Sequence, residues 1–255
     1  MFFIDTHTHV SDEAFKGEED AIVEKAVAAG VGLMLQADVD SSERDAMWAV
    51  VERHPEHLRA MVGLYPGSVA ADWRDELDAL EPYKSRGAVA FGEIGLDYHF
   101  STEFKKEQQE VFRIQLEMAS KMGLPVNIHL RDATEDFFTI IEESRHLGLR
   151  GNLHAFSGSP ETFARLQKYG DWYVGIGGVV TFKKASLAET VKHIPLDRIL
   201  LETDAPYMAP TPLRGTRNDS SNIPLIAAKI AEIKGVDIEE VAATTSGNAR
   251  QLFAL

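Results

Sequence analysis

Short apolar runs that are compatible with β-strands alternate with segments of helical periodicity along almost the whole chain. The strand-like runs cover residues 2–7, 32–36, 58–64, 88–95, 125–129, 151–154, 172–176 and 198–202. Continuous apolar runs of this length are typical of parallel strands that are buried on both faces. Their regular recurrence predicts a repeated strand–helix unit.

Several of the intervening segments carry clear helix signals. Over residues 103–121, Val111, Ile114 and Met118 recur at the spacing of one helix face. Ser159 followed by Pro160 is typical of a helix start, with the serine as N-cap and the proline in the first turn. Two more helices are predicted at 223–233 and 238–252.

Eight βα units in 255 residues favour a TIM barrel, the (β/α)₈ fold, formed by one α/β domain over residues 1–255. An open, doubly wound sheet is the main alternative. The two can be distinguished by where the reactive side chains fall, because a barrel collects them from the C-terminal ends of several strands.

Composition narrows the chemistry. The chain has no cysteine, so nitrogen and oxygen atoms must hold any metal ion. We expect neither a signal peptide nor a membrane span, and hence a soluble, cytoplasmic protein, because the N-terminus lacks a basic segment and the apolar runs are short. The net charge of −14 argues against a broad grip on duplex DNA, although bound cations can still attract a phosphate.

Six potential metal ligands stand at the ends of predicted strands. They are His7 and His9 on the first, Glu93 on the fourth, His129 on the fifth, His154 on the sixth and Asp204 just after the eighth. Any one of them alone is more simply explained as a hydrogen-bonded structural residue. Their coincidence at one end of a predicted barrel favours a shared metal site.

Six ligands are too many for one tetrahedral ion and suit two ions that share a bridging group. We assign His7, His9 and Asp204 to one ion and His129 and His154 to the other. Glu93 can bridge them, since each of its oxygens can face one ion. Asp204 can also accept the proton of an attacking water, so Glu93 and Asp204 are the candidate catalytic groups. The ligand set allows Zn²⁺, Mn²⁺ or Mg²⁺.

Taken in order, the motifs of this chain resemble the TatD family of metal-dependent deoxyribonucleases and hydrolases. They are Asp5-Thr6-His7-Thr8-His9, residues 92–97, His129-Leu130-Arg131, residues 154–158, residues 202–207, residues 213–218 and residues 248–253. The resemblance implies a TIM barrel of the metallo-dependent hydrolase type, two divalent ions on the six ligands, and hydrolysis of phosphodiester bonds in DNA. It further implies exonuclease action on single strands or 3′ ends, with no membrane and no obligate protein partner.

One departure from the family pattern affects the expected chemistry. The family usually has Gly-x-His-Pro-His after the third strand, whereas this chain has Gly63-Leu64-Tyr65-Pro66-Gly67. Tyr65 can donate a hydrogen bond, but it cannot replace histidine as a near-neutral acid or base. A smaller departure lies at Asp219-Ser220, where Glu-Pro is frequent.

Four supporting positions have two explanations each. Arg131 can clamp a phosphate or form a structural salt bridge. Asp97 can contact substrate or hold its loop. Glu202 can orient a ligand from behind or simply end a buried strand network. The glycines at 175–178 can bind phosphate or allow close backbone packing. We assign Tyr65, Asp97 and Arg131 to substrate binding and Glu202 to ligand orientation.

Three other functions remain open from the residues alone. A metallohydrolase on the same scaffold could cut a small phosphoester, an amide or a lactone, but such enzymes often carry a carboxylated lysine where Glu93 stands. A phosphatase that opens with His-x-His needs late histidine ligands, and no histidine follows His193. A binding protein with a relic site would not need all six ligands.

Overall fold

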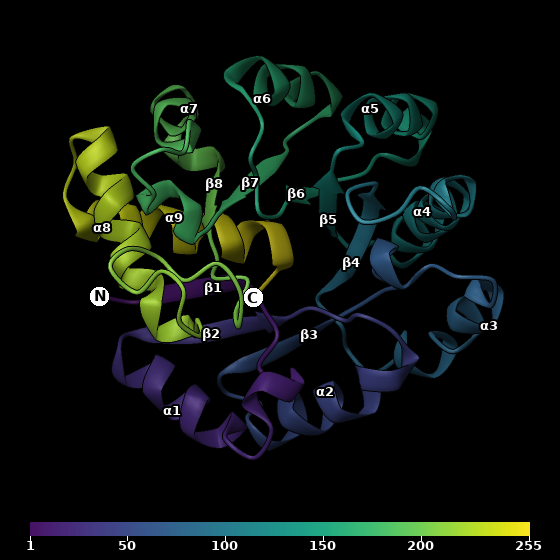
Figure 1. Ribbon diagram of the computed structural model, residues 1–255, viewed down its shortest axis with the longest axis horizontal. Coiled ribbons are helices and arrows are strands. Elements are labelled where there is room, and N and C mark those ends of the chain that lie inside the picture. Colours follow the sequence, from purple (N-terminus) through teal and green to yellow (C-terminus); the bar gives the residue numbers. More distant parts are fainter.

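Eight parallel strands follow one another around the centre of the molecule, in sequence order. The computed structural model describes all residues, 1–255. The strands are β1 (Phe3–Thr8), β2 (Val31–Gln36), β3 (Leu58–Val62), β4 (Ala90–Asp97), β5 (Val126–Arg131), β6 (Gly151–Leu153), β7 (Tyr173–Ile176) and β8 (Ile199–Leu201). Figure 1 shows them ringed by helices.

The ring closes between the first and the last strand. The Asp204 amide donates to the His7 carbonyl oxygen at 2.9 Å, and Thr8 and Ala205 form a parallel bridge. The barrel predicted from the eight βα units is therefore confirmed, and the open sheet was the wrong alternative. Each predicted strand overlaps an observed one, with ends that differ by a few residues.

Helices connect the strands and cover the outside of the barrel. They are α1 (Glu19–Ala28), α2 (Ser41–Arg53), α3 (Trp73–Asp78), α4 (Lys105–Met122), α5 (Thr134–Glu143), α6 (Pro160–Leu166), α7 (Leu187–His193), α8 (Ile223–Lys234) and α9 (Ile238–Phe253). The predicted start of α6 is confirmed, since the Thr162 amide donates to the Ser159 hydroxyl at 3.2 Å. No helix combines the length and the apolar character that a membrane crossing requires.

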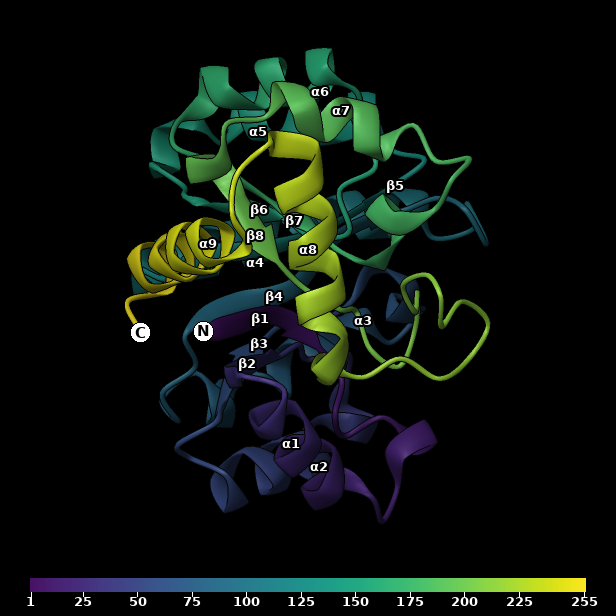
Figure 2. The same ribbon diagram turned by 90° about the vertical axis from the view of Figure 1, so that its left-hand side faces the viewer.

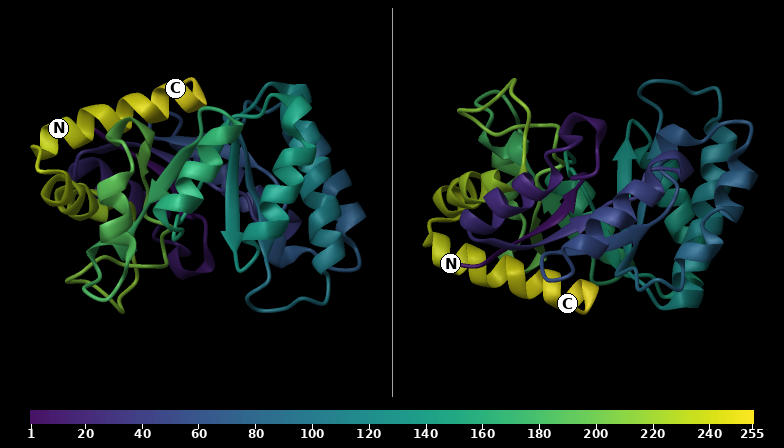
Figure 3. Two further views of the ribbon diagram at one scale, coloured as in Figure 1. Left: turned by 90° about the horizontal axis from the view of Figure 1, so that it is seen from above. Right: turned by 90° about the horizontal axis from the view of Figure 1, so that it is seen from below.

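The last helix closes the N-terminal end of the barrel. Leu252 and Phe253 of α9 are buried in one apolar cluster with inward-facing strand residues such as Ile4, Leu35 and Leu200. Burying side chains of this size contributes about 1.5–3 kcal/mol each. Figure 3 shows α9 and both chain termini on the side opposite the loop that follows β8.

The other end of the barrel is formed by the loops that follow the strands. In Figure 2 the yellow-green loop between β8 and α8 projects to the right, away from the two termini. A buried ion pair supports this end, because Arg44 Nε donates to Asp38 Oδ2 at 2.7 Å and the Gly63 amide donates to the same oxygen. These contacts hold the segments that follow β2 and β3 together at the open end.

Candidate metal centre

All six candidate ligands lie together at the open end of the barrel. His7, Glu93 and His154 are almost inaccessible, whereas the Asp204 side chain keeps 21% of its surface exposed. Asp204 and Ala155 both adopt positive φ angles, of 55° and 45°. Non-glycine residues in that region often mark a site whose geometry the surrounding structure enforces.

One group of donor atoms comes from β1 and from the loop after β8. His7 Nε2 and His9 Nε2 are 3.2 Å apart, and they lie 3.7 and 3.6 Å from Asp204 Oδ1. Glu93 Oε2 approaches both imidazoles, at 3.4 Å from His7 Nε2 and 3.7 Å from His9 Nε2. We call His7, His9 and Asp204 the first half of the centre.

A second group lies on the other side of the same carboxylate. Glu93 Oε1 is 2.7 Å from His129 Nδ1 and 2.8 Å from His154 Nε2, and these two nitrogens are 3.1 Å apart. We call His129 and His154 the second half. The halves adjoin, because the rings of His7 and His154 stack with centroids 3.8 Å apart.

The donor spacing fits a bound metal ion. Two ligands about 2.1 Å from one tetrahedral ion lie about 3.4 Å from each other. In the first half, the two imidazole nitrogens lie 3.2 Å from each other and 3.4 to 3.7 Å from the oxygens of Asp204 and Glu93. His7, Glu93 and His154 also offer donor atoms within 4.8 Å of one another. The residues present therefore suit a metal centre built from nitrogen and oxygen.

Hydrogen bonds from behind determine which nitrogen each ring presents. His7 Nδ1 donates to Asn127 Oδ1 at 2.8 Å, and the Asn127 amide nitrogen donates in turn to Asn152 Oδ1. His129 Nε2 donates to Asp97 Oδ2 at 3.0 Å. His7 Nε2 and His129 Nδ1 are thereby left for a metal. Such contacts fix the tautomer and orientation of a ligating histidine.

The carboxylates of the centre are held in their charged form. Burial alone would raise the pKa of Glu93, but electrostatic interaction with the His154 and His7 rings and the hydrogen bonds from the second half hold it well below its usual value. Burial likewise opposes ionisation of Asp204, and the neighbouring imidazoles, His9 first, lower its pKa nevertheless. Two negative charges are therefore available to cations.

The two histidines of the second half have pKa values shifted in opposite directions. Burial and the adjacent His7 ring lower the pKa of His154 to about 4. Burial also disfavours protonation of His129, but its hydrogen bonds with Asp97 and Glu93 outweigh that effect and raise its pKa to about 9. A neutral imidazole is the form that binds metal, so His154 is ready to ligate, whereas His129 must first lose a proton.

Glu202 lies next to His154 on the side away from Glu93. Its side chain is fully buried, and burial raises its pKa well above the usual value. Oε1 accepts a hydrogen bond from the Ala155 amide and lies 3.8 Å from His154 Nδ1. The other oxygen occupies the space next to Gly175, where a β-carbon would come within 1.8 Å. Close packing therefore accounts for that glycine.

The three residues predicted to bind substrate lie in different surroundings. Asp97 is buried, and its oxygens accept from His129, from Tyr65 Oη at 3.3 Å and from the His99 amide at 2.8 Å. Of its two possible roles, holding the loop matches these contacts. Burial and nearby carboxylates raise the pKa of Tyr65, so its hydroxyl stays protonated. Arg131 is exposed at the end of β5.

Sequence reasoning missed Asn127, although a signal was present. Asn127 precedes His129 by two positions on β5, so both side chains point into the barrel. The remaining histidines lie elsewhere: His54, His57, His146 and His193 contact other parts of the surface, and His99 Nδ1 donates to Asp132 Oδ2 on the rim.

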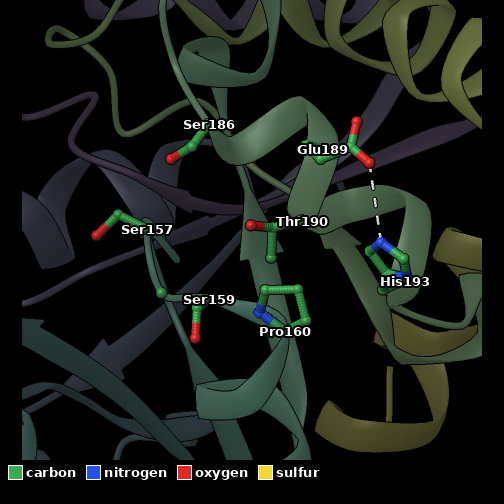
Figure 4. Close-up of a pocket in the computed structure, with 8 residues that line it drawn as sticks. Ser157, Ser159, Pro160, Ser186, Glu189, Thr190 and His193 are labelled. Atoms are coloured by element: carbon green, nitrogen blue, oxygen red, sulfur yellow. Dashed lines mark ion pairs between the residues drawn. The ribbon is translucent and has the colours of Figure 1, made fainter.

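A separate cavity of about 350 Å³ lies between α6 and α7. Its wall includes Ser157, Ser159, Thr190 and the ion pair of Glu189 with His193, as Figure 4 shows. None of the six ligands borders it. The cavity therefore takes no part in the centre described above.

Comparison with known proteins gives consistent matches over the whole chain. The sequence profile of a family described as "TatD related DNase" matches residues 4–254. The "Uncharacterized metal-dependent hydrolase YabD" of Bacillus subtilis is 38% identical, with 98% of each chain covered. The "3'-5' ssDNA/RNA exonuclease TatD" of Erwinia tasmaniensis is 32% identical over 98% of this chain and 99% of its own.

A solved structure agrees with these relatives. The crystal structure of YJJV, a TatD homologue from Escherichia coli K12, superimposes with a TM-score of 0.92 at 29% sequence identity, and the match covers 99% of this chain and 98% of that one. The barrel and its order of strands are thus shared along the entire length.

Proposed function

Because the chain belongs to the TatD family of metal-dependent hydrolases, we propose that it cleaves phosphodiester bonds of nucleic acids, removing nucleotides from the 3′ end of single strands. The name of the Erwinia relative supports this choice of substrate. The observation that carries the proposal is the position of Glu93, whose two oxygens face two separate groups of donors.

The six ligands divide between two divalent ions in this proposal. His7, His9 and Asp204 would hold one ion, His129 and His154 would hold the other, and Glu93, which lies between the two groups, would serve both. Bound ions would supply an activated water and positive charge for the phosphate. Zn²⁺, Mn²⁺ and Mg²⁺ all accept such ligands.

Asp204 is the proposed proton acceptor. Its side chain is more accessible than that of Glu93, and its lowered pKa keeps it ionised at neutral pH. An ionised carboxylate at the edge of the site can take the proton of the attacking water. Glu93 is buried and occupied on both sides, so it serves as the shared ligand.

Arg131 and Tyr65 are the proposed contacts for the substrate phosphate. The Arg131 guanidinium can bind a phosphate through two parallel hydrogen bonds. Tyr65 Oη, which donates to Asp97, can donate to a phosphate oxygen instead because it remains protonated. Asp97 and Glu202 act on the ligands His129 and His154 from behind and do not contact substrate.

The test is a time course with 5′-labelled single-stranded DNA and RNA and enzyme loaded with each of the three metals. We expect products that shorten one nucleotide at a time from the 3′ end. Glu93→Gln is the inactive control. Glu103→Gln changes an exposed residue on the loop between β4 and α4 and should retain activity. Complete inertness toward both nucleic acids would refute the proposal in favour of a small phosphoester, amide or lactone.

A further inference from the structure

Large apolar side chains are exposed on two loops around the mouth of the barrel. Phe100, after β4, has 80% of its surface exposed, and Tyr207, Met208 and Leu213, after β8, have 55%, 47% and 39%. Only three other large apolar side chains are comparably exposed, Met1, Phe2 and Leu225. Single exposed apolar residues are ordinary, but their concentration beside a candidate active site indicates a binding surface.

His99, the residue before Phe100, anchors the loop after β4. The His99 amide donates to Asp97 Oδ1 at 2.8 Å, and His99 Nδ1 bonds to Asp132 Oδ2 at 2.8 Å, which ties the loop after β4 to the loop after β5. The His99 ring meets Phe100 edge-on, with centroids 4.9 Å apart. Asp97 also accepts a hydrogen bond from His129, so the backbone just before Phe100 is connected to the metal centre.

The guanidinium of Arg131 lies 5.0 Å from the centre of the Phe100 ring. Arg131 forms no ion pair, whereas Lys105, at the start of the neighbouring helix α4, is paired with Asp136. The Arg131 guanidinium thus lies beside an exposed ring and outside any ion pair. The pair therefore offers an aromatic face and a free positive charge together.

More unpaired cations lie on the loops after β7 and β8. Lys183 and Lys184 are exposed, and Arg214 packs over the Phe182 ring at 4.5 Å without a carboxylate partner. Arg217, on the same loop as Arg214, pairs with Glu18 and is neutralised. Lys183, Lys184 and Arg214 therefore stand outside ion pairs on these two loops.

We propose that Phe100 and Arg131 form a subsite for one nucleotide of single-stranded nucleic acid, in which the base stacks on Phe100 and its phosphate binds Arg131. This subsite rests on the proposed function. Aromatic rings next to unpaired cations are the usual means of binding single strands without sequence preference. A duplex would not fit, because its bases are stacked on each other and the molecule lacks the broad basic face that duplex binding requires.

Phe100→Ala tests the subsite kinetically. Loss of one stacked base should raise KM for single-stranded DNA about tenfold, with little change in kcat, and Phe100→Trp should keep KM near that of the parent enzyme. The effect should be much smaller on a single strand with abasic sites, which has no base to stack on the ring. Leu225→Ala, which removes an exposed side chain from α8, is the matched control and should leave KM unchanged.

Binding provides a second measurement that does not depend on turnover. A fluorescent single-stranded oligonucleotide with phosphorothioate linkages resists cleavage, and its anisotropy reports the Kd with metal-loaded enzyme. We expect Phe100→Ala to weaken binding about tenfold and Arg131→Ala to reduce the slope of log K against log salt by about 0.7.

The outcomes separate this inference from the proposed function. If Phe100→Ala binds and cleaves DNA with parental KM and Kd, the subsite is refuted while nuclease activity stands. If the parent enzyme binds neither DNA nor RNA, both proposals fail. If the parent enzyme binds single strands without cutting them, and Phe100→Ala weakens that binding, the subsite stands and the nuclease proposal falls.

Discussion

The two halves of the centre differ in how closely their donor atoms approach. In the first half, His7, His9 and Asp204 offer atoms 3.2–3.7 Å apart, which is close to the edge of a tetrahedron around an ion. In the second half, Glu93, His129 and His154 are 2.7–3.1 Å apart and bond directly to one another. The first half has the wider spacing, with one hydrogen-bond contact between His7 and His9, whereas all three contacts of the second half are hydrogen bonds.

This difference teaches that the two ions should bind with unequal affinity. An ion entering the second half must break hydrogen bonds and displace a proton from His129, whose pKa is raised to about 9 by Asp97 and Glu93 against the effect of burial. The proton competes with the metal for the nitrogen, so the affinity for metal is lower where the ligand must first be deprotonated. We therefore expect the first half to fill before the second.

Glu93→Gln should have the largest effect, because it removes the one group that serves both halves. An amide has a single oxygen acceptor, so one half must lose its contact. We expect activity to fall by more than about 100-fold and both ions to bind less tightly. Metal analysis after dialysis provides the measurement, and two retained ions with parental activity would disprove the shared-ligand assignment.

Asp97→Asn should lower the metal affinity of the second half and leave that of the first half unchanged. The amide preserves the shape of the side chain but weakens its bond to His129 Nε2. Loss of such a supporting group typically lowers metal affinity about 10–100-fold. Titration with metal should therefore show a weakened second site beside an unchanged first site. Equal weakening of both sites would contradict the comparison.

Much of this arrangement could be predicted from the sequence, and particular residues show where prediction ends. That the six candidate ligands lie together could be predicted because each follows an apolar run, and strand ends converge in a barrel. Asn127 was missed because its partner, His7, is 120 residues away and meets it only across the closed barrel. The Arg44–Asp38 pair and the space that Glu202 takes beside Gly175 likewise depend on three-dimensional packing that no local pattern encodes.

Asn127→Ala should act on the first half with a smaller effect. The change removes one hydrogen bond to His7 Nδ1, and the net value of a single hydrogen bond is about 1 kcal/mol. We expect the affinity of the first site to fall about fivefold and the second to remain unchanged. Isothermal titration of the metal-free protein would measure both. A loss confined to the second site would reverse the assignment of His7.

Tyr65→Phe should have the smallest effect of the series. Its hydroxyl donates to Asp97 at 3.3 Å, a long hydrogen bond at the edge of the second half. We expect the second site to weaken by only about twofold, while KM for DNA rises by a similar factor if the hydroxyl also contacts phosphate. A large loss of kcat would instead mean that Tyr65 takes over the role of the family's histidine.

The position of the bound metal tests the central claim most directly. Crystals of metal-loaded protein, measured at the absorption edge of that metal, should show two anomalous peaks, one on each side of the Glu93 carboxylate. His7, His9 and Asp204 should surround one peak, and His129 and His154 the other. A single peak, or two peaks of which neither contacts Glu93, would contradict the account.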